Sequence, residues 1–237
     1  MSLENTLKAL GQIRTPIIYD AVEKFNVRPR TDGIMDPSIR AQLPGLGPMV
    51  GYACTGKVVG AHPPADGETM VAWRELWELV DRSPSPTVVV AEDLDHPPAR
   101  SCAWGDVAAS LMLRLGAVGA VTNGGIRDLP EVENLGFQLC APAAVVGHAH
   151  IRWVEIDVPV KVGSLVVHPG DLIHADEHGV MTIPKEIPPE ELLRFVHEFL
   201  ASEKTIVDYC SEGQFDIDTL CRLMEEHNER TSGHMSS

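Results

Sequence analysis

One segment near the middle of the chain constrains the fold more than any other. Residues 87–92 (TVVVAE) and 117–122 (AVGAVT) are short apolar stretches typical of buried strands, and residues 105–115 between them are amphipathic. A strand, a helix and a second strand in this order form a β-α-β unit, whose two strands are parallel. The sequence therefore predicts an α/β protein.

The charged residues of this segment stand where the predicted strands end. Asp106 follows the first strand, and Arg127 and Asp128 follow the second. Because ligands of open α/β sheets bind beyond the carboxyl ends of the strands, these side chains are expected on adjacent loops at one edge. Gly124 and Gly125 precede them and permit close backbone approach or a positive φ.

The helix between the strands is expected to contribute backbone groups. The apolar spacing of residues 105–115 places Val107, Leu111 and Leu115 on one face of this helix. The N–H groups of Val107 and Ala108 lie at the start of this helix, where they suit the carboxylate of an anion.

The residue types indicate a small site for a 2-oxo acid chelated to a metal ion. Asp128 is a hard oxygen ligand suited to Mg²⁺, which often takes one or two protein carboxylates and keeps several waters. Asp106 is placed to hold one of those waters, and Arg127 offers a planar fork to a carboxylate or enolate oxygen. The alternative is a surface salt bridge between Arg127 and Asp106 with a helix cap, which is a common and weak arrangement.

The spacing of these residues resembles a known family. Gly105 and Asp106, then twenty residues, then Arg127 and Asp128 at the end of GGIRD, are similar to the HMG/CHA aldolases. These are class II pyruvate aldolases that share a fold with the regulator-of-ribonuclease-activity-A family. The stretches that extend the resemblance over most of the chain are residues 19–22 (YDAV), 51–56 (GYACTG), 170–173 (GDLI) and 176–180 (DEHGV).

The resemblance implies one domain over residues 1–237, an α-β-β-α sandwich of the swivelling β/β/α, RraA-like type. Residues 1–45 would form N-terminal helices and a loop, and residues 188–237 a C-terminal helical extension. The implied assembly is a homotrimer or homohexamer in the cytoplasm.

The resemblance also implies an activity. The enzyme would cleave 2-oxo acids of the 4-hydroxy-4-methyl-2-oxoglutarate type, and decarboxylate oxaloacetate, through a pyruvate enolate stabilised by Mg²⁺, Mn²⁺ or another divalent cation. Asp128 would bind the metal, Arg127 the pyruvyl oxygen, and Asp106 a metal-bound water. Gly105, Asp106, Val107, Ala108 and Arg127 would form the substrate-binding set.

An acid from a neighbouring subunit is a further implication. Glu203, in the predicted C-terminal helix, is the candidate for this third catalytic residue. The alternative is that Glu203 lies on a solvated face of that helix.

Several features leave other functions open. Where family members carry a glycine-rich segment, residues 92–98 (EDLDHPP) are bulkier and stiffened by proline, which favours a related lyase on another 2-oxo acid if they line the site. A Schiff-base route would need a desolvated lysine, for which Lys161 is the nearest candidate. Cys102 lies close to the motif and is a candidate catalytic thiol, with a packing role as the alternative. A non-catalytic, protein-binding regulator is the alternative outside the enzymes.

Composition limits the partners. The net charge of −15 disfavours nucleic acid and anionic membranes, and five scattered cysteines without a C-x-x-C pair indicate reduced thiols in a cytoplasmic protein. No apolar run is long enough to span a membrane.

The i,i+4 pair His174 and His178 is expected in a hairpin and not in a zinc helix. Trp73 and Trp77 are expected in the core or at a subunit contact.

The remaining elements are predicted from periodicity and turn residues. They are two short helices before residue 43, the second beginning at Thr15–Pro16; a loop over 28–48; a strand pair or one long bent strand over 49–61; a helix over 68–81; a helix over 129–135; a strand over 137–146; short strands over 151–184; a helix over 188–212; a second short helix; and a frayed end over 231–237.

Overall fold

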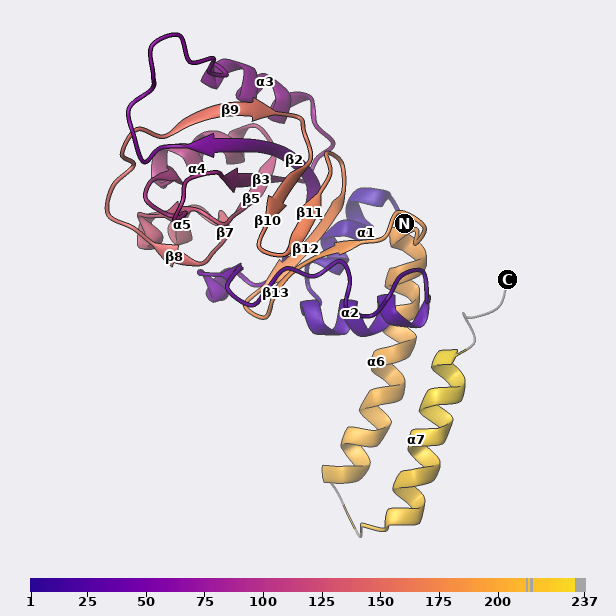
Figure 1. Ribbon diagram of the computed structural model, residues 1–237. Coiled ribbons are helices and arrows are strands. Elements are labelled where there is room, and N and C mark those ends of the chain that lie inside the picture. Colours follow the sequence, from indigo (N-terminus) through magenta and orange to yellow (C-terminus); the bar gives the residue numbers. More distant parts are fainter. Residues whose placement is uncertain (212, 214, 233–237) are drawn as a thin grey trace.

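A strongly curved sheet of eight strands forms the centre of the molecule (Figure 1). The computed structural model describes residues 1–211, 213 and 215–232. The strand order is β1-β7-β5-β3-β2-β12-β13, and β9 also pairs with β2. These strands are β1 (Arg40–Ala41), β2 (Met49–Val59), β3 (Thr87–Asp93), β5 (Ala117–Thr122), β7 (Gln138–Ala141), β9 (Arg152–Ile156), β12 (Leu172–Asp176) and β13 (Gly179–Ile183).

The sheet closes almost into a barrel. β3 and β5 are parallel, as predicted, and β2 and β7 are parallel to them, whereas β1, β9, β12 and β13 are antiparallel to their neighbours. A bridge between Ile34 and Met181 joins the segment before β1 to β13, at the other end of the strand order. The hairpin of β10 (Val160–Val162) and β11 (Leu165–Val167) packs against β3. The α/β class predicted from the sequence is confirmed.

A second, three-stranded parallel sheet extends the first. It consists of β4 (Cys102–Trp104), β6 (Gly125–Ile126) and β8 (Ala143–Ala144), in the order β4-β6-β8. These strands follow β3, β5 and β7 in the chain, so three parallel strands of the large sheet lead into three of the small one. The strand predicted over 137–146 is therefore two strands separated by Pro142.

Helices cover the large sheet on two sides. α3 (Trp73–Arg82), α4 (Asp106–Arg114) and α5 (Leu129–Leu135) share one hydrophobic cluster with its strands, and α1 (Leu3–Leu10), α2 (Thr15–Lys24) and α6 (Pro189–Ser211) share another. Successive side chains of β3 point to opposite faces. Val88 and Val90 pack in the barrel, whereas Val89 and Ala91 pack toward α3–α5, which explains the unbroken apolar run.

Several predicted boundaries need correction. The helix predicted over 68–81 begins only at Trp73, and the loop predicted over 28–48 contains β1 and a 3₁₀ turn, Pro44–Leu46. The segment over 49–61 is one long strand, β2, with an irregularity between Lys57 and Val58. α2 begins at Thr15, as predicted, and its N-cap residue is Arg14.

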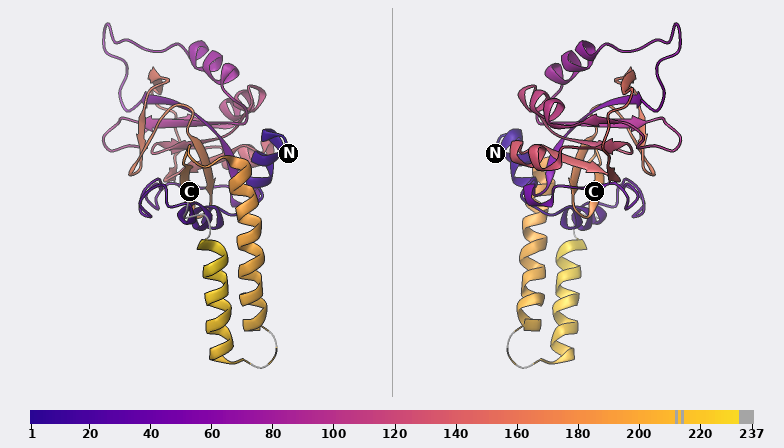
Figure 2. Two further views of the ribbon diagram at one scale, coloured as in Figure 1. Left: turned by 90° about the vertical axis from the view of Figure 1, so that its right-hand side faces the viewer. Right: turned by 90° about the vertical axis from the view of Figure 1, so that its left-hand side faces the viewer.

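The C-terminal helices form an arm. The first half of α6 buries side chains such as Leu192, Phe195 and Phe199, and its second half runs beside α7 (Ile217–Ser232) away from the barrel (Figure 2). α7 has 16 residues and is longer than the short helix predicted. Thr231, expected to be frayed, is buried, and residues 233–237 lie outside the described residues. No described helix is both long and apolar enough to cross a membrane.

Candidate functional site

The pairing of β4 with β6 brings the three predicted charged residues together. The Arg127 N–H donates to the Trp104 carbonyl at 3.0 Å, which fixes the end of β6 beside the end of β4. The Asp106 N–H then lies 3.3 Å from Asp128 Oδ2, and Arg127 Nε lies 3.4 Å from the same oxygen. The expectation of adjacent loops at one edge is confirmed.

Two backbone features hold Asp128 in this position. Its φ of 56° and ψ of 39° are left-handed, which is uncommon outside glycine and typical of functional sites. Gly105 lies against its side chain, and a Cβ on Gly105 would overlap Asp128 Oδ2. The absence of a side chain at residue 105 therefore makes room for the carboxylate.

Gly124 and Gly125 serve close approach. Neither has a positive φ, so that alternative of the prediction does not apply. A Cβ on Gly124 would lie 3.0 Å from Asp93 Oδ2, and one on Gly125 would lie 2.9 Å from the Ser101 carbonyl oxygen. The two glycines let β6 pack tightly between its neighbours.

The polar groups of the site differ in what they already bind. Asp106 Oδ1 accepts the Val107 N–H at 2.7 Å, so this amide, predicted to take a substrate carboxylate, is engaged. The Ala108 N–H and Asp128 Oδ1 have no hydrogen-bond partner among the described residues. The Arg127 and Asp128 side chains are 36% and 30% exposed, so they remain accessible to a ligand.

The donor set fits a hard divalent cation. Asp128 offers a free carboxylate oxygen at an accessible position, and Asp106, whose backbone N–H lies 3.3 Å from Asp128 Oδ2, brings a second carboxylate to the same end of α4. Mg²⁺ needs no more than one or two such groups because it retains waters. Asp128 and Asp106 are therefore the residues that could hold such an ion.

A cavity of about 260 Å³ adjoins these residues. Asp106 and Arg127 line it together with Trp73 and Trp77 of α3 and Leu111 of α4. Both tryptophans are 37% exposed, so they do not belong to the core. The prediction of a core position is wrong for them, and the prediction of a subunit contact stays a prediction.

The apolar face predicted for α4 is only partly buried, because Leu111 and Leu115 are half-buried and Val107 is exposed. Val107 is 77% exposed and, like Leu111, lines the cavity, whereas Ala109 and Met112 are the buried residues. Apolar periodicity identifies an apolar face but not what covers it. Here the small Ala109 side chain allows α4 to pack closely, and the Val107 face is left to the cavity.

Glu203 lies away from this cluster within the chain. It is on α6 in the arm, where its charge acts on Asp20 of α2 and His227 of α7. In Figures 1 and 2 the arm points away from α4. A role for Glu203 would require a neighbouring subunit, so it stays a prediction.

The alternative chemistries find less support. Lys161 is exposed on β10 and lacks the desolvation that a Schiff-base lysine needs. Burial raises the pKa of the Cys102 thiol, although the Arg127 charge opposes this, so the thiolate is disfavoured.

The atypical 92–98 segment does not line the cavity, and hydrogen bonds from its aspartates to backbone N–H groups hold it in place. The Asp93 carboxylate accepts the N–H groups of Asp95 and Ala99 at 2.9 and 2.8 Å. The Asp95 carboxylate accepts those of Gly60 and Ala61 at 2.9 and 2.7 Å. The segment is thus a rigid support beside Gly124.

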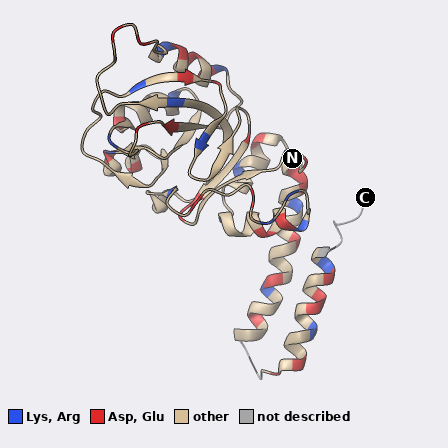
Figure 3. Ribbon diagram, viewed as in Figure 1, with Lys and Arg blue, Asp and Glu red and all other residues tan. Residues whose placement is uncertain are grey.

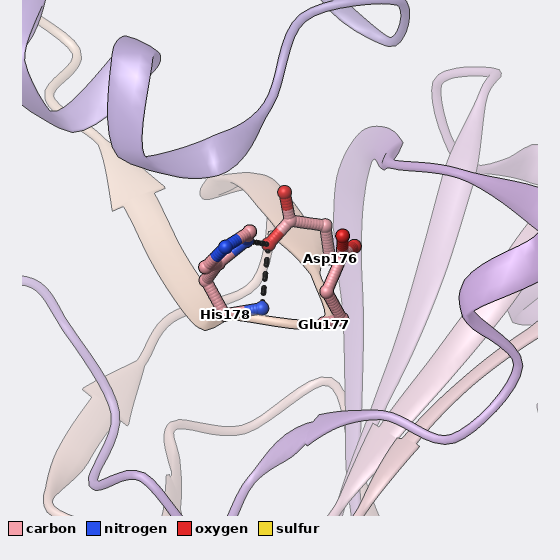
Figure 4. Close-up of side chains that lie close together, drawn as sticks. All are labelled: Asp176, Glu177 and His178. Carbon is pink, nitrogen blue, oxygen red and sulfur yellow. Dashed lines mark hydrogen bonds and ion pairs between the residues drawn. The ribbon is translucent and has the colours of Figure 1, made fainter.

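Asp176, Glu177 and His178 form the one group of at least three close metal-ligating side chains among the described residues (Figure 4). Asp176 Oδ1 accepts the His178 N–H at 2.8 Å, and Oδ2 accepts the Thr15 N–H at 2.8 Å. Glu177 binds Arg14 through both oxygens. The carboxylates are therefore engaged in joining α2 to the β12–β13 turn.

Burial and hydrogen bonds have opposite effects on the Asp176 pKa. Burial would raise it, but the donors Thr15 and His178 outweigh burial and the pKa is lowered. His174, the other half of the suspected zinc pair, is fully buried on β12, so the expectation that the two histidines lie in a hairpin is confirmed.

His174 is expected to make stability depend on pH. Burial lowers its pKa from 6.5 to about 4, although the hydrogen bond that its Nε2 donates to the Leu10 carbonyl opposes this. Between these pH values the unfolded state binds the extra proton, so the free energy of unfolding should fall by about 3 kcal/mol as the pH drops from 6.5 to 4. Urea unfolding of the protein and of His174→Gln across this range measures the difference.

The exposed His168 supplies the control for this experiment. His168→Gln should retain the full pH dependence, whereas His174→Gln should lose the part due to His174. Parallel pH profiles for the protein and His174→Gln would contradict the assignment.

Sequence reasoning missed His148, which lines the cavity with Arg127. It lies on the loop after β8, the third strand of the small sheet. Because β4, β6 and β8 are parallel, the loop after β8 belongs to the same edge as Asp106 and Arg127. The position of His148 after the strand predicted over 137–146 was the available signal.

Comparison with known proteins defines the family. A family model described as RraA-like, Aldolase/RraA, matches residues 15–182, and the chain belongs to this family. A putative 4-hydroxy-4-methyl-2-oxoglutarate aldolase of Halalkalibacterium halodurans is 30% identical over 122 residues, 51% of this chain and 55% of the relative. A 4-hydroxy-4-methyl-2-oxoglutarate aldolase of Thermus thermophilus is 34% identical over 91 residues, 38% of this chain and 54% of the relative. The chain thus spans about half the length of these relatives.

Solved structures support the fold. An uncharacterized protein from Pseudomonas syringae pv. tomato has a TM-score of 0.72 at 22% identity, with 95% of each chain covered. RraAS2 of Streptomyces coelicolor, described as an unusual member of the RNase ES inhibitor RraA protein family, has a TM-score of 0.65 at 22% identity, with 85% of this chain and 96% of that chain covered. The RraA-like fold expected from the sequence is confirmed.

Proposed function

We propose that the protein is a divalent-metal-dependent carbon–carbon lyase that forms pyruvate from a 2-oxo acid. The observation that carries this proposal is the accessible Asp128 carboxylate, held beside Arg127 and the start of α4 by the β4–β6 pairing. The relatives named as 4-hydroxy-4-methyl-2-oxoglutarate aldolases support the same chemistry. Its substrates would be 4-hydroxy-2-oxo acids, of which 4-hydroxy-4-methyl-2-oxoglutarate is the reference, and oxaloacetate.

Each residue has a task in this proposal. A bound Mg²⁺ or Mn²⁺ would act as a Lewis acid toward the 2-oxo group, and Asp128 would hold it. Arg127 would stabilise the negative charge that develops on the enolate oxygen. The free Ala108 N–H would orient the substrate carboxylate, and Asp106 would hold a water that takes the proton of the leaving hydroxyl. The Val107 N–H is bonded to Asp106 Oδ1 and would reach a substrate carboxylate only after Asp106 rotates away.

The proposed oligomeric state and cellular location bear on how the site is completed. A homotrimer or homohexamer in the cytoplasm would place an acid of a neighbouring subunit, with Glu203 the candidate, near the site. Figure 3 shows Lys and Arg scattered between Asp and Glu over the barrel and the arm, and the net charge of −15 disfavours a nucleic-acid partner.

Pyruvate release tests the function directly. The purified protein should release pyruvate from oxaloacetate and from 4-hydroxy-4-methyl-2-oxoglutarate with Mg²⁺ or Mn²⁺, lose this activity in excess EDTA and regain it when Mg²⁺ is restored. The ratio of the rates with the two substrates shows whether aldol cleavage or decarboxylation is the main activity. A folded, metal-supplied protein that releases no pyruvate from either would favour the non-catalytic regulator.

A further inference from the structure

The cavity beside the site has two chemical parts. Asp106 and Arg127 supply charged groups, and Trp73, Trp77 and Leu111 supply apolar surface. Asp106 is the first residue of α4, Arg127 follows β6, and Leu111 lies more than one turn farther along α4 than Asp106, about 7.5 Å in rise. One cavity therefore continues from the charged groups onto a stretch of apolar wall.

The apolar wall is open to a ligand. Val107 and Leu111 are four residues apart and share one face of α4, while Trp73 and Trp77 share one face of α3. Val107 is 77% exposed, and each tryptophan is 37% exposed. Exposed apolar side chains gathered at one place mark a binding surface more often than scattered ones do.

The charges identify the occupant. Of the described residues that line the cavity, Arg127 is the only lysine or arginine. A substrate with one carboxylate can direct that group toward Arg127 and the free Ala108 N–H. A second carboxylate farther along would lie against the tryptophans with no lysine or arginine to pair with, which is costly when the group is desolvated; apart from Arg127, the one basic side chain lining the cavity among the described residues is His148.

We infer that the preferred substrate is a 4-hydroxy-2-oxo acid with a single carboxylate and an apolar, preferably aromatic, substituent at C4. This inference rests on the proposed function and narrows its substrate class. The 2-oxo acid head would occupy the Arg127 end, and the C4 substituent would contact Trp73, Trp77 and Leu111. The tryptophan faces suit a ring, because aromatic pairs are favoured beyond the area that they bury.

The reaction of such a substrate balances without a further reagent. The C4 hydroxyl loses its proton, the C3–C4 bond breaks, and C4 becomes the carbonyl carbon of an apolar aldehyde or ketone. The electron pair of the broken bond goes to the pyruvate enolate, which takes up a proton at C3. The products are pyruvate and the apolar carbonyl compound.

Binding of two matched ligands tests the inference independently of turnover. 2-Oxo-4-phenylbutanoate and 2-oxoglutarate share the 2-oxo acid head, and neither has a hydroxyl at C4, so neither can be cleaved. Calorimetric titration with Mg²⁺ present should give at least about tenfold tighter binding of the phenyl compound. In Trp77→Ala this preference should fall to less than about threefold, while Arg74→Ala on the same helix should keep it, because Arg74 is exposed and outside the cavity.

Turnover supplies the second measurement. Trp77→Ala should lower kcat/KM for 4-hydroxy-2-oxo-4-phenylbutanoate about tenfold and change oxaloacetate decarboxylation less than twofold, because oxaloacetate has no substituent to reach the tryptophans. Equal or tighter binding of 2-oxoglutarate, together with normal oxaloacetate turnover, would overturn the inference and leave the proposed function standing. Absence of turnover with every substrate would instead remove the proposed function.

Sedimentation of Trp77→Ala checks the competing occupant. If a second copy of the chain covers these tryptophans, the variant should change its oligomeric state, and both substrates should lose activity together. That result would overturn the inference. An unchanged sedimentation coefficient with selective loss of the phenyl substrate supports it.

Discussion

Asp128→Asn is expected to lower kcat/KM for oxaloacetate by about 1,000-fold, the equivalent of about 4 kcal/mol of transition-state stabilisation. The substitution removes the charge that a divalent cation requires but keeps the size and shape of the side chain. The amide oxygen can still accept the Asp106 N–H, which lies 3.3 Å from Asp128 Oδ2. Asparagine also tolerates the left-handed backbone at this residue, so the fold should be retained.

Two measurements separate loss of chemistry from loss of structure. The melting temperature of Asp128→Asn should stay within a few degrees of the parent, while Mn²⁺ binding, followed by electron paramagnetic resonance, should weaken strongly. Asp66→Asn is the matched control, because Asp66 is exposed in the loop before α3 and outside the site. If Asp128→Asn retained Mn²⁺ affinity and turnover, the metal assignment would be wrong, and the salt bridge with Arg127 would be purely structural.

Proximity of the charged residues was predictable because it depends on topology. The apolar runs of β3 and β5 and the helix between them require a parallel arrangement, and parallel strands place their carboxyl ends at one edge. Asp106 and Arg127 follow two such strands, so their approach follows from connectivity alone. The same reasoning, extended to β8, would have found His148.

Features that depend on tertiary packing were not predictable. The division of residues 137–146 into β7 and β8 occurs where the chain passes from one sheet to the other, and both halves have the composition of strands. The exposure of Val107 reflects a cavity that α3 and α4 form together, which periodicity within one helix cannot reveal. The hydrogen bond from the Val107 N–H to Asp106 Oδ1 depends on the rotamer of the Asp106 side chain, which the sequence does not determine.

Gly105→Ala is expected to lower kcat/KM about 100-fold while the protein remains folded. The backbone of Gly105 is extended, with φ −150° and ψ −170°, so alanine can adopt it without strain. The effect must therefore come from the added methyl group, which would overlap Asp128 Oδ2 and lie 3.2 Å from Arg127 Nε. Displacing a catalytic group by about 1 Å can cost two orders of magnitude in rate.

The control for Gly105→Ala is another glycine whose added methyl group has room. At Gly11 the nearest atom to an added Cβ is the Lys8 carbonyl oxygen at 3.5 Å, and φ is −66°, so Gly11→Ala should leave kcat/KM unchanged. Steady-state kinetics with oxaloacetate and Mn²⁺ titration of both variants measure the difference. Full activity in Gly105→Ala would mean that Asp128 can move without consequence, and that the proximity of Gly105 to its carboxylate is a packing detail. A 100-fold loss with normal unfolding would instead show that chemistry depends on the position of that carboxylate, because the substitution alters neither its charge nor the net charge of the protein.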